Sequence, residues 1–424
     1  MNREPSGSRN SGNPAAVAGL ARSLGLTHAV LYGLGITIGA GIYVLVGLAA
    51  GRAGVHAPLA FLMAALIMGF SAATFAELGT RLPVAASEAA YVEAAFRRKR
   101  VALAVGLLSV VTSAISAATI AVGAAGYVSV FLPLPKPVLV TGIILLLGAI
   151  ATRATLQAVS IAGVMTVIEV AGLAIIIAAG LWMLDLGTPI QVMASGLADA
   201  AVWPGVASAA LLAVFAFIGF EHLVNVSEEM KDQRRTLPRA LFITLGLTGV
   251  IYALVVLIAV AAVPPAELAG SSAPLALVFQ RLTGWPLGLM SAIAVAATLN
   301  GILVNMIIIA RVLYGLADRG QLPKGLAQVH PETRAPVMAT LLAVVAILML
   351  ALAVPLAGLA DLASIGTLLI FVLVNVALIV IKWREERPPP DIFRCPFWVP
   401  VAGVVTSSAL LVVDIARRVW ALPA

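Results

Sequence analysis

The sequence predicts an all-α polytopic membrane protein. Hydrophobic residues make up 62% of its 424 residues and charged residues only 11%, whereas soluble domains are about half apolar and a quarter charged. The mean hydropathy is +1.08. Apolar stretches near the roughly 20 residues needed to cross a hydrocarbon core follow one another closely along the chain. Together, these observations exclude a chain of several soluble domains.

Eleven apolar segments are expected to cross the membrane. They are 27–50, 57–78, 101–130, 137–152, 160–184, 206–227, 240–263, 285–310, 337–354, 362–381 and 397–415. The fourth segment is the shortest, and Lys136 beside it has a side chain long enough to reach the membrane interface.

The basic residues indicate the orientation. If the N-terminus lies inside, 21 of the 26 Lys and Arg residues fall in inner segments, as the enrichment of cytoplasmic loops in these residues requires. We therefore expect a multi-pass protein of the cell membrane with a cytoplasmic N-terminus and an outer C-terminus. The same bias explains the net charge of +7 without nucleic acid, because no aromatic and basic surface is evident. Membrane lipids are the expected surroundings, and the oligomeric state is left open.

Residues 1–25 are rich in Ser, Gly, Asn and Pro and are expected to form a disordered cytoplasmic tail. No short apolar core with a cleavage site follows, so the tail does not read as a signal peptide. Cys395 is the single cysteine, which excludes an intrachain disulfide and a thiolate metal cluster within one chain. The four histidines form no HExxH-like motif, and no cofactor is expected.

The first segment contains the stretch ITIGAGIYVLVG, residues 36–47, with Gly39-Ala40-Gly41 near the middle of the membrane. Glycine in a helix interior costs about 1 kcal/mol relative to alanine. Transporters open helices at this depth, because the free amides and carbonyls of the two half-helices bind substrate or ions. The alternative is a small-residue face for close helix packing.

A second break is expected in segment 206–227, where Gly219 lies near the centre and Glu221 and His222 follow. Two interrupted helices, five segments apart and crossing in opposite directions, indicate an inverted repeat. The expected units are 26–184 with helices 1–5 and 205–382 with helices 6–10. Residues 383–424 then form a linker and the eleventh helix. The halves share no sequence similarity, so this repeat is inferred from hydropathy and breaks.

Five stretches, in order, resemble the amino acid–polyamine–organocation (APC) superfamily, close to its cationic amino acid transporter branch. They are LGLTHAVLYGLGITIGAGIYVLVG, FAELGTRLPVAASEAAYVEAAF, FAFIGFEHLVNVSEEMKDQRRTLPRAL, ARVLYGLADRGQLPKGLAQVHPETRAPV and ASIGTLLIFVLVNVALIV. The resemblance covers almost the whole chain. It implies a LeuT-like fold with 5+5 inverted repeats, discontinuous first and sixth helices, and transport by alternating access.

The resemblance also implies a substrate site at the two breaks. The substrate carboxylate would meet backbone amides near Gly39, at Ala40, Gly41 and Ile42, and the α-amino group would meet carbonyls at Phe215, Ala216 and Ile218. Two features depart from the family. Many relatives have twelve spanning segments rather than eleven, and the usual Ser-Gly-Gly after the second helix is replaced by Ala86-Ser87-Glu88.

Two carboxylates are expected within the membrane, where an unpaired charge costs about 2.5 kcal/mol or more. Glu169 lies about eight residues, or about 12 Å of helix rise, from the inner end of its segment. In some proton-coupled relatives a Lys at this place in the fifth helix stands in for a bound sodium ion. The residue here is acidic, so the role of that Lys cannot be carried over unchanged. A buried carboxylate suits proton uptake and release, although Glu169 could equally bond a neighbour and lock two helices. Glu221 could bind a substrate cation, carry the coupling proton or bond the freed backbone of its break.

Other polar residues at mid-depth allow two interpretations. Ser113 and Ser116 on the third segment, and Thr298 and Asn300 on the eighth, could face a cavity or bond neighbouring helices. Asn305 and Asn375 are assigned structural roles.

The expected function is therefore secondary active transport of amino acids or related amines, coupled to protons. An amino acid or amino acid–polyamine exchanger and a non-transporting amino acid sensor remain alternatives, and a channel is less compatible with a broken-helix site. No catalytic constellation supports an enzyme. Because Glu221 favours a cationic substrate only if it faces the cavity, neutral and cationic amino acids both stay open.

Overall fold

The computed structural model describes residues 24–39, 41–82, 87–152, 158–318, 320–330, 335–385 and 390–420. These ranges contain helices and short connections and no β-strand, which confirms the all-α class. An isolated backbone bridge joins Leu24 to Met230. The predicted N-terminal tail lies outside the described residues except for Leu24 and Gly25.

The helices follow the expected order along the chain. The α-helices are α1 (Leu26–Ile38), α2 (Gly41–Ala53), α3 (Ala57–Arg81), α4 (Ser87–Phe96), α5 (Lys99–Val128), α6 (Lys136–Ala151), α7 (Ala158–Met183), α8 (Gly187–Gly196), α9 (Trp203–Phe217), α10 (Gln233–Ala262), α11 (Pro265–Gly270), α12 (Pro274–Thr283), α13 (Gly288–Asp318), α14 (Val337–Ala353), α15 (Leu356–Arg384) and α16 (Trp398–Trp420). The 3-10 helices are η1 (Gly54–His56), η2 (Phe220–Glu229) and η3 (Lys324–Ala327).

Within the described ranges, eight helical stretches are long and apolar enough to cross a membrane, and α1, α6 and α14 are shorter apolar helices. The chain is therefore a polytopic membrane protein. Each of the eleven expected segments overlaps one of these helices, and α6, at 16 residues, is short as predicted. The first segment is divided between α1 and α2, and the sixth between α9 and η2.

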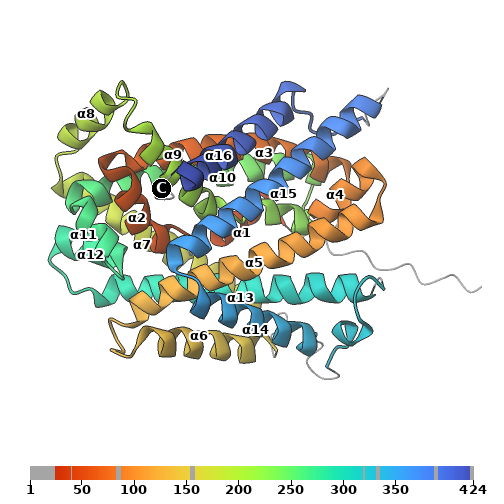
Figure 1. Cartoon of the computed structure of the whole chain (residues 1–424), viewed down its shortest axis with the longest axis horizontal. Coiled ribbons are helices and arrows are strands. Elements are labelled where there is room, and N and C mark those ends of the chain that lie inside the picture. The colour runs from red at the N-terminus through yellow and green to blue at the C-terminus, as the bar shows by residue number, and fades with distance from the viewer. Residues whose placement is uncertain are drawn as a thin grey trace, which may run out of the picture.

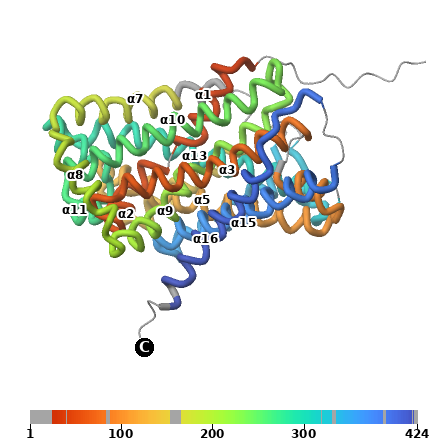
Figure 2. Tube along the Cα trace, turned by 90° about the horizontal axis from the view of Figure 1, so that it is seen from above, coloured from red at the N-terminus to blue at the C-terminus, as the bar shows by residue number. Residues whose placement is uncertain are grey.

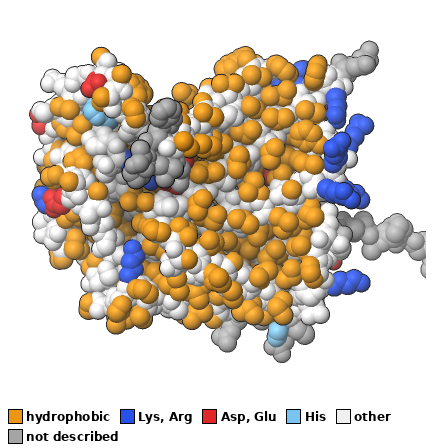
Figure 3. Space-filling model, in the orientation of Figure 1, with side chains coloured by type: hydrophobic (Ala, Val, Ile, Leu, Met, Phe, Trp, Pro, Cys, Tyr) orange, Lys and Arg blue, Asp and Glu red, His pale blue; other side chains and the backbone are white. Residues whose placement is uncertain are grey.

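The surface has the character of a lipid-facing protein. Hydrophobic side chains cover the middle of the molecule, whereas Lys and Arg gather at the end that carries α4 (Figures 1 and 3). Trp182 and Trp383, near the ends of α7 and α15, are 90% and 86% exposed. Tryptophan is enriched where the hydrocarbon meets the headgroups, so these residues mark the two edges of the apolar band.

The buried residues fall into two main clusters. One is centred on α1, α2, α3, α9 and α10, and α1 packs along α10 (Figure 2). The other is centred on α5, α6, α13 and α14, which lie side by side in Figure 1. The helix breaks lie where these two groups of helices meet, and a cavity with polar groups in its lining lies beside them.

Polar contacts attach α15 to α2 and α3 along its length. Near its beginning, Asp361 forms an ion pair with Arg52 at 2.8 Å. In its middle, Asn375 accepts a hydrogen bond from Thr74 at 2.6 Å and donates one to Ser71 at 3.0 Å, in keeping with the structural role predicted for it.

The C-terminal end of α15 carries a second ion pair. Lys382 lies 2.7 Å from the fully buried Glu77 of α3. Buried charges are stable only when paired, so these contacts fix how α15 sits against α2 and α3.

Candidate functional site

The first helix opens where the sequence predicts. Helix α1 ends at Ile38 and α2 begins at Gly41. Gly39 has φ −12° and ψ −84°, outside the helical region, and Ala40 lies outside the described residues. The packing interpretation also holds in part, because a Cβ added at Gly41 would lie 2.5 Å from the Cα of Ala216. Gly41 therefore lets the two broken helices touch.

The second break begins directly after Phe217, where α9 ends. Ile218 is extended, with φ −60° and ψ 132°, and Gly219 has φ +127°, a conformation open to glycine and strained for other residues. A Cβ at Gly219 would also lie 2.8 Å from the carbonyl oxygen of Ile36. Glycine at this position thus permits both the turn of the chain and its close approach to α1.

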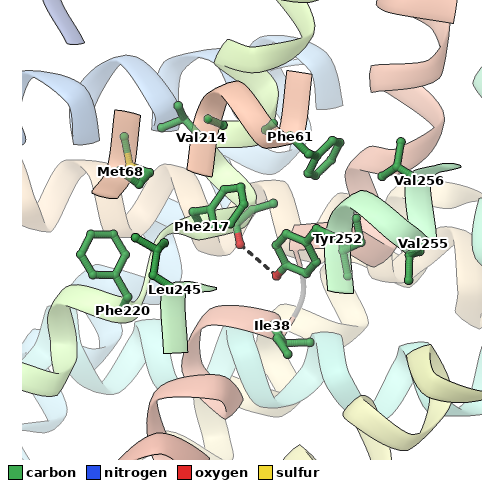
Figure 4. Packing of buried hydrophobic residues seen from close by; sticks show 14 of the residues in the cluster. Ile38, Phe61, Met68, Val214, Phe217, Phe220, Leu245, Tyr252, Val255 and Val256 are labelled. Atoms are coloured by element: carbon green, nitrogen blue, oxygen red, sulfur yellow. Dashed lines mark hydrogen bonds between the residues drawn. The ribbon is translucent and has the colours of Figure 1, made fainter. Parts of the chain in front are cut away.

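A tyrosine that sequence reasoning missed joins the two breaks. The hydroxyl of Tyr252, on α10, lies 2.9 Å from the carbonyl oxygen of Thr37 and 3.0 Å from that of Ala216. These carbonyls belong to the last turns of α1 and α9, where intrahelical donors run out. The ring packs edge-on against Phe61 and close to Phe217 (Figure 4). Its only sequence signal is a hydroxyl in the middle of an apolar helix.

A cavity that is partly open to solvent lies beside the breaks. Its described lining is Gly35, Ile36, Thr37, Gly41, Ser116, Ile120, Phe215, Ile218, Gly219, His222, Asn300, Gly301, Val304, Asn305 and Ile308. Of the predicted substrate-binding residues, Gly41, Phe215 and Ile218 therefore line the cavity. Gly39, Ile42 and Ala216 are not in the lining, and the last two are fully buried next to it.

The polar groups of the lining are hydroxyl, amide and imidazole side chains, and no Asp or Glu is among its described residues. Ser116 and Asn300 line the cavity, which agrees with the first of the two roles considered for them, facing a cavity rather than bonding a neighbouring helix. Thr298 instead donates to the carbonyl of Ala294 at 2.7 Å. Asn305 was assigned a structural role, and it donates to the carbonyl of Gly301 at 2.9 Å while also lining the cavity.

Glu221 turns toward the break that precedes it. Its Oε2 accepts a hydrogen bond from the backbone N–H of Gly219 at 2.8 Å, and the residue is only 4% exposed. Of the three roles considered for it, this geometry supports bonding to the freed backbone. A carboxylate is well suited to this position, because the amides at the start of η2 have no intrahelical acceptor.

Glu169 is fully buried on α7. Its two carboxyl oxygens have no well-oriented hydrogen-bond partner among the described residues, although the amide side chain of Asn300 lies within interaction range. The backbone carbonyl of Glu169 accepts a hydrogen bond from Tyr43 of α2 at 2.9 Å. Asn300 is therefore the side chain that connects this carboxyl group to the cavity.

No cluster of three or more potential metal ligands occurs in the part of the chain that the structure describes. The groups that could bind a ligand are therefore hydrogen-bond donors and acceptors. They are the backbone amides and carbonyls at the two helix breaks, the neutral polar side chains, and one buried carboxyl group behind Asn300.

Comparisons with known proteins agree with this description. Residues 24–418 match the protein family described as amino acid permease. The chain is 30% identical to the branched-chain amino acid permease BcaP of Bacillus subtilis, over 93% of this chain and 88% of that protein. It is 27% identical to a methylthioribose transporter of the same organism, over 92% and 87% of the two chains.

A third relative is the vacuolar cationic amino acid transporter 2 of Arabidopsis thaliana, at 27% identity over 88% of this chain and 62% of that protein. The family match includes both helix breaks and every described residue of the cavity lining.

Proposed function

The chain belongs to the amino acid permease family, and we propose that it is a secondary active transporter that carries neutral aliphatic amino acids into the cell together with protons. We infer this substrate class from the cavity lining, which consists of apolar side chains and neutral polar groups. A cationic side chain that leaves water for this partly enclosed site would need a carboxylate partner. Glu221, the nearest candidate in sequence, is engaged by Gly219.

The backbone at the two breaks supplies the groups that recognise an amino acid. The free amides at the start of α2, near Gly41 and Ile42, suit the substrate carboxylate, because a helix N-terminus attracts anions. The carbonyls at the end of α9, at Phe215, Ala216 and Ile218, suit the ammonium group. Leucine, isoleucine and valine share these two groups and differ only in an apolar side chain, which Ile120, Phe215 and Val304 can contact.

Proton coupling is assigned to Glu169. A fully buried carboxyl group without a good hydrogen-bond partner is stable when protonated and costly when charged. Asn300 extends from the cavity to this group. Substrate in the cavity and a proton on Glu169 would therefore influence one another through a single side chain.

Alternating access is proposed on the 5+5 inverted repeat, with units 26–184 and 205–382. The cavity is lined in part by the last turn of α1, by His222 of η2 and by residues 300–308 in the middle of α13. From there α13 runs on toward the end of the molecule that carries α4, where Lys and Arg gather (Figures 1 and 3). At the other end, Arg52 of α2 pairs with Asp361 of α15 and donates to the carbonyl of Ser208 on α9. We therefore assign the structure to an inward-facing state, with a cytoplasmic N-terminus in the cell membrane.

An exchanger of amino acids is the second candidate, because the same site would serve both modes. Purified protein in liposomes distinguishes the two. We expect labelled leucine, isoleucine and valine to accumulate when the outside is acidic, and arginine and putrescine to accumulate far less. Leucine flux that appears only when the liposomes are preloaded with leucine would indicate exchange. Accumulation of arginine in place of leucine would contradict the assigned substrate class.

A further inference from the structure

Four consecutive cationic residues lie in the turn between α4 and α5, and all of them are exposed. They are Arg97, Arg98, Lys99 and Arg100. None of the four forms an ion pair within the part of the chain that the structure describes. Like charges so close together repel one another, so this turn favours a negatively charged partner from outside the chain.

The start of α5 adds to this repulsion. Lys99 and Arg100 occupy the first turn of α5, which contains no acidic residue, and the side chain of Arg98 before them forms no capping hydrogen bond. The N-terminus of a helix carries a partial positive charge and is stabilised by acidic rather than basic side chains. An anion at this turn would therefore neutralise both the four side chains and the end of the helix.

The turn lies at the level of the membrane surface. Arg384, at the end of α15, donates a hydrogen bond to the carbonyl oxygen of Ala95, which places a fifth cation close to the turn. Trp383, next to Arg384, is 86% exposed and marks the edge of the apolar band. Lys and Arg gather at this end of the molecule (Figure 3). These cations are therefore at the depth of phospholipid headgroups.

An apolar strip of α5 leads away from the cations into the apolar band. Ala104, Leu107 and Val111 are exposed, and their spacing from Arg100 places all four residues on one face of the helix. A molecule that contacts the whole of this face needs an anionic head and an apolar chain. A phospholipid has both parts, whereas a free phosphate ion would contact the cations alone.

We infer that residues 97–100 and the exposed face of α5 below them bind an anionic phospholipid, which holds α4 in place. Clusters of four or more Lys and Arg at a membrane surface attract anionic lipids. In the orientation proposed above, the lipid belongs to the inner leaflet.

Helix α4 connects this lipid site to the second helix break. The ring of Tyr91 on α4 packs edge-on against Phe75 of α3, at a centroid distance of 6.3 Å. Phe75 in turn packs against Phe220, the first residue of η2, at 6.2 Å. A lipid that holds the turn after α4 would therefore also restrain the helix that follows the break.

The test uses the purified full-length protein, delipidated in a neutral detergent, and compares wild type with two double variants. Lys99→Gln/Arg100→Gln removes two cations of the turn. Arg234→Gln/Arg235→Gln is the matched control, because it removes two exposed cations of α10 that each lie 3.7 Å from an aspartate. Without added lipid, the melting temperature of Lys99→Gln/Arg100→Gln is expected to equal or exceed that of wild type, since the change relieves repulsion at the start of α5.

Native mass spectrometry measures the binding of dioleoylphosphatidylglycerol, which is anionic, and of dioleoylphosphatidylcholine, which has no net charge. We expect the anionic lipid to bind about 30-fold more weakly to Lys99→Gln/Arg100→Gln than to wild type or the control, because each cation near the membrane surface contributes about fivefold. Hydrogen–deuterium exchange in peptides of α4 is expected to slow when this lipid is added to wild type and to stay unchanged in Lys99→Gln/Arg100→Gln.

Equal binding of the anionic lipid to wild type and Lys99→Gln/Arg100→Gln would overturn the inference. An equal loss in the α10 control would do the same, because it would indicate diffuse attraction, as would exchange in α4 that does not respond to the lipid. A melting temperature of Lys99→Gln/Arg100→Gln below that of wild type without lipid would show that these cations already have a structural partner.

Inorganic phosphate replaces the lipid in a further arm of the experiment. If it slows exchange in α4 as much as dioleoylphosphatidylglycerol does, the turn binds a free anion and the apolar face of α5 is not part of the site. None of these measurements uses leucine, so their outcome is independent of whether the proposed substrate is correct.

Discussion

Gly41 of α2 and Ala216 of α9 lie in direct backbone contact, since a Cβ at Gly41 would come within 2.5 Å of the Ala216 Cα. This contact joins two segments that are far apart in the sequence at the depth where both helices open. It explains why glycine, which lowers the stability of a helix, occurs in this apolar segment. Any side chain at position 41 would push the two breaks apart.

Gly41→Ala is therefore expected to lower the stability of the protein by about 1–3 kcal/mol through overpacking and to abolish leucine uptake. Gly69→Ala on α3 is the matched control, because a Cβ there meets nothing within 4 Å, and it is expected to be neutral or slightly stabilising. Thermal unfolding in detergent and uptake into liposomes measure both effects. Normal uptake by Gly41→Ala would contradict the close contact.

Glu221 provides a second prediction. Glutamine retains an oxygen that can accept the N–H of Gly219, whereas leucine does not. We expect Glu221→Gln to transport at a rate close to wild type and Glu221→Leu to lose about 1–3 kcal/mol of stability together with most activity. Melting temperature and leucine uptake of the two variants decide the point. Loss of transport in a stable Glu221→Gln would instead indicate that the negative charge itself is needed.

Glu169→Gln tests the coupling residue. Glutamine resembles the protonated carboxyl group and cannot release a proton, so uptake is expected to become independent of the proton gradient while leucine–leucine exchange persists. Glu228→Gln, a change at an exposed glutamate of η2, serves as control. Gradient-driven accumulation in Glu169→Gln at the wild-type level would rule out this residue as the proton carrier.

Cys395 lies between α15 and α16, where its backbone N–H and thiol contact the Glu77 carboxylate at 2.8 and 3.2 Å. Burial and this negative charge raise the pKa of the thiol to about 12. The thiolate is the reactive form, so below that pH the folded protein is expected to resist N-ethylmaleimide. Mass spectrometry at pH 7.5 should find labelling only after denaturation in SDS. Rapid labelling of the native protein would show that this segment is not packed as described.

The sequence allowed much of the architecture to be predicted, because lipid leaves few choices for the backbone. Long apolar segments must be helical, and the glycines near positions 40 and 219 marked both breaks. The contacts of Tyr252 could not be predicted, since they depend on how α10 is rotated against α1 and α9. The short helices α8, α11 and α12 were also missed, because their length and composition do not separate them from ordinary loops.

Part of the cavity lining was predicted for the same reason. Gly41, Phe215 and Ile218 line the cavity because they adjoin the breaks, which hydropathy and glycine placement reveal. The orientation of Glu221 toward Gly219 and the position of Asn300 between the cavity and Glu169 depend on side-chain rotamers and helix rotation. Periodicity alone does not fix these features.

The central claim is that backbone groups at the two breaks recognise both ends of an amino acid. The most direct measurement is competition against the uptake of labelled leucine. The competitors are unlabelled leucine and two analogues, 3-methylbutylamine, which lacks the carboxylate, and 4-methylpentanoate, which lacks the amine. We predict that leucine competes strongly and that each analogue competes at least about tenfold more weakly, since each leaves one set of buried backbone groups unpaired. Equal competition by either analogue would contradict the account.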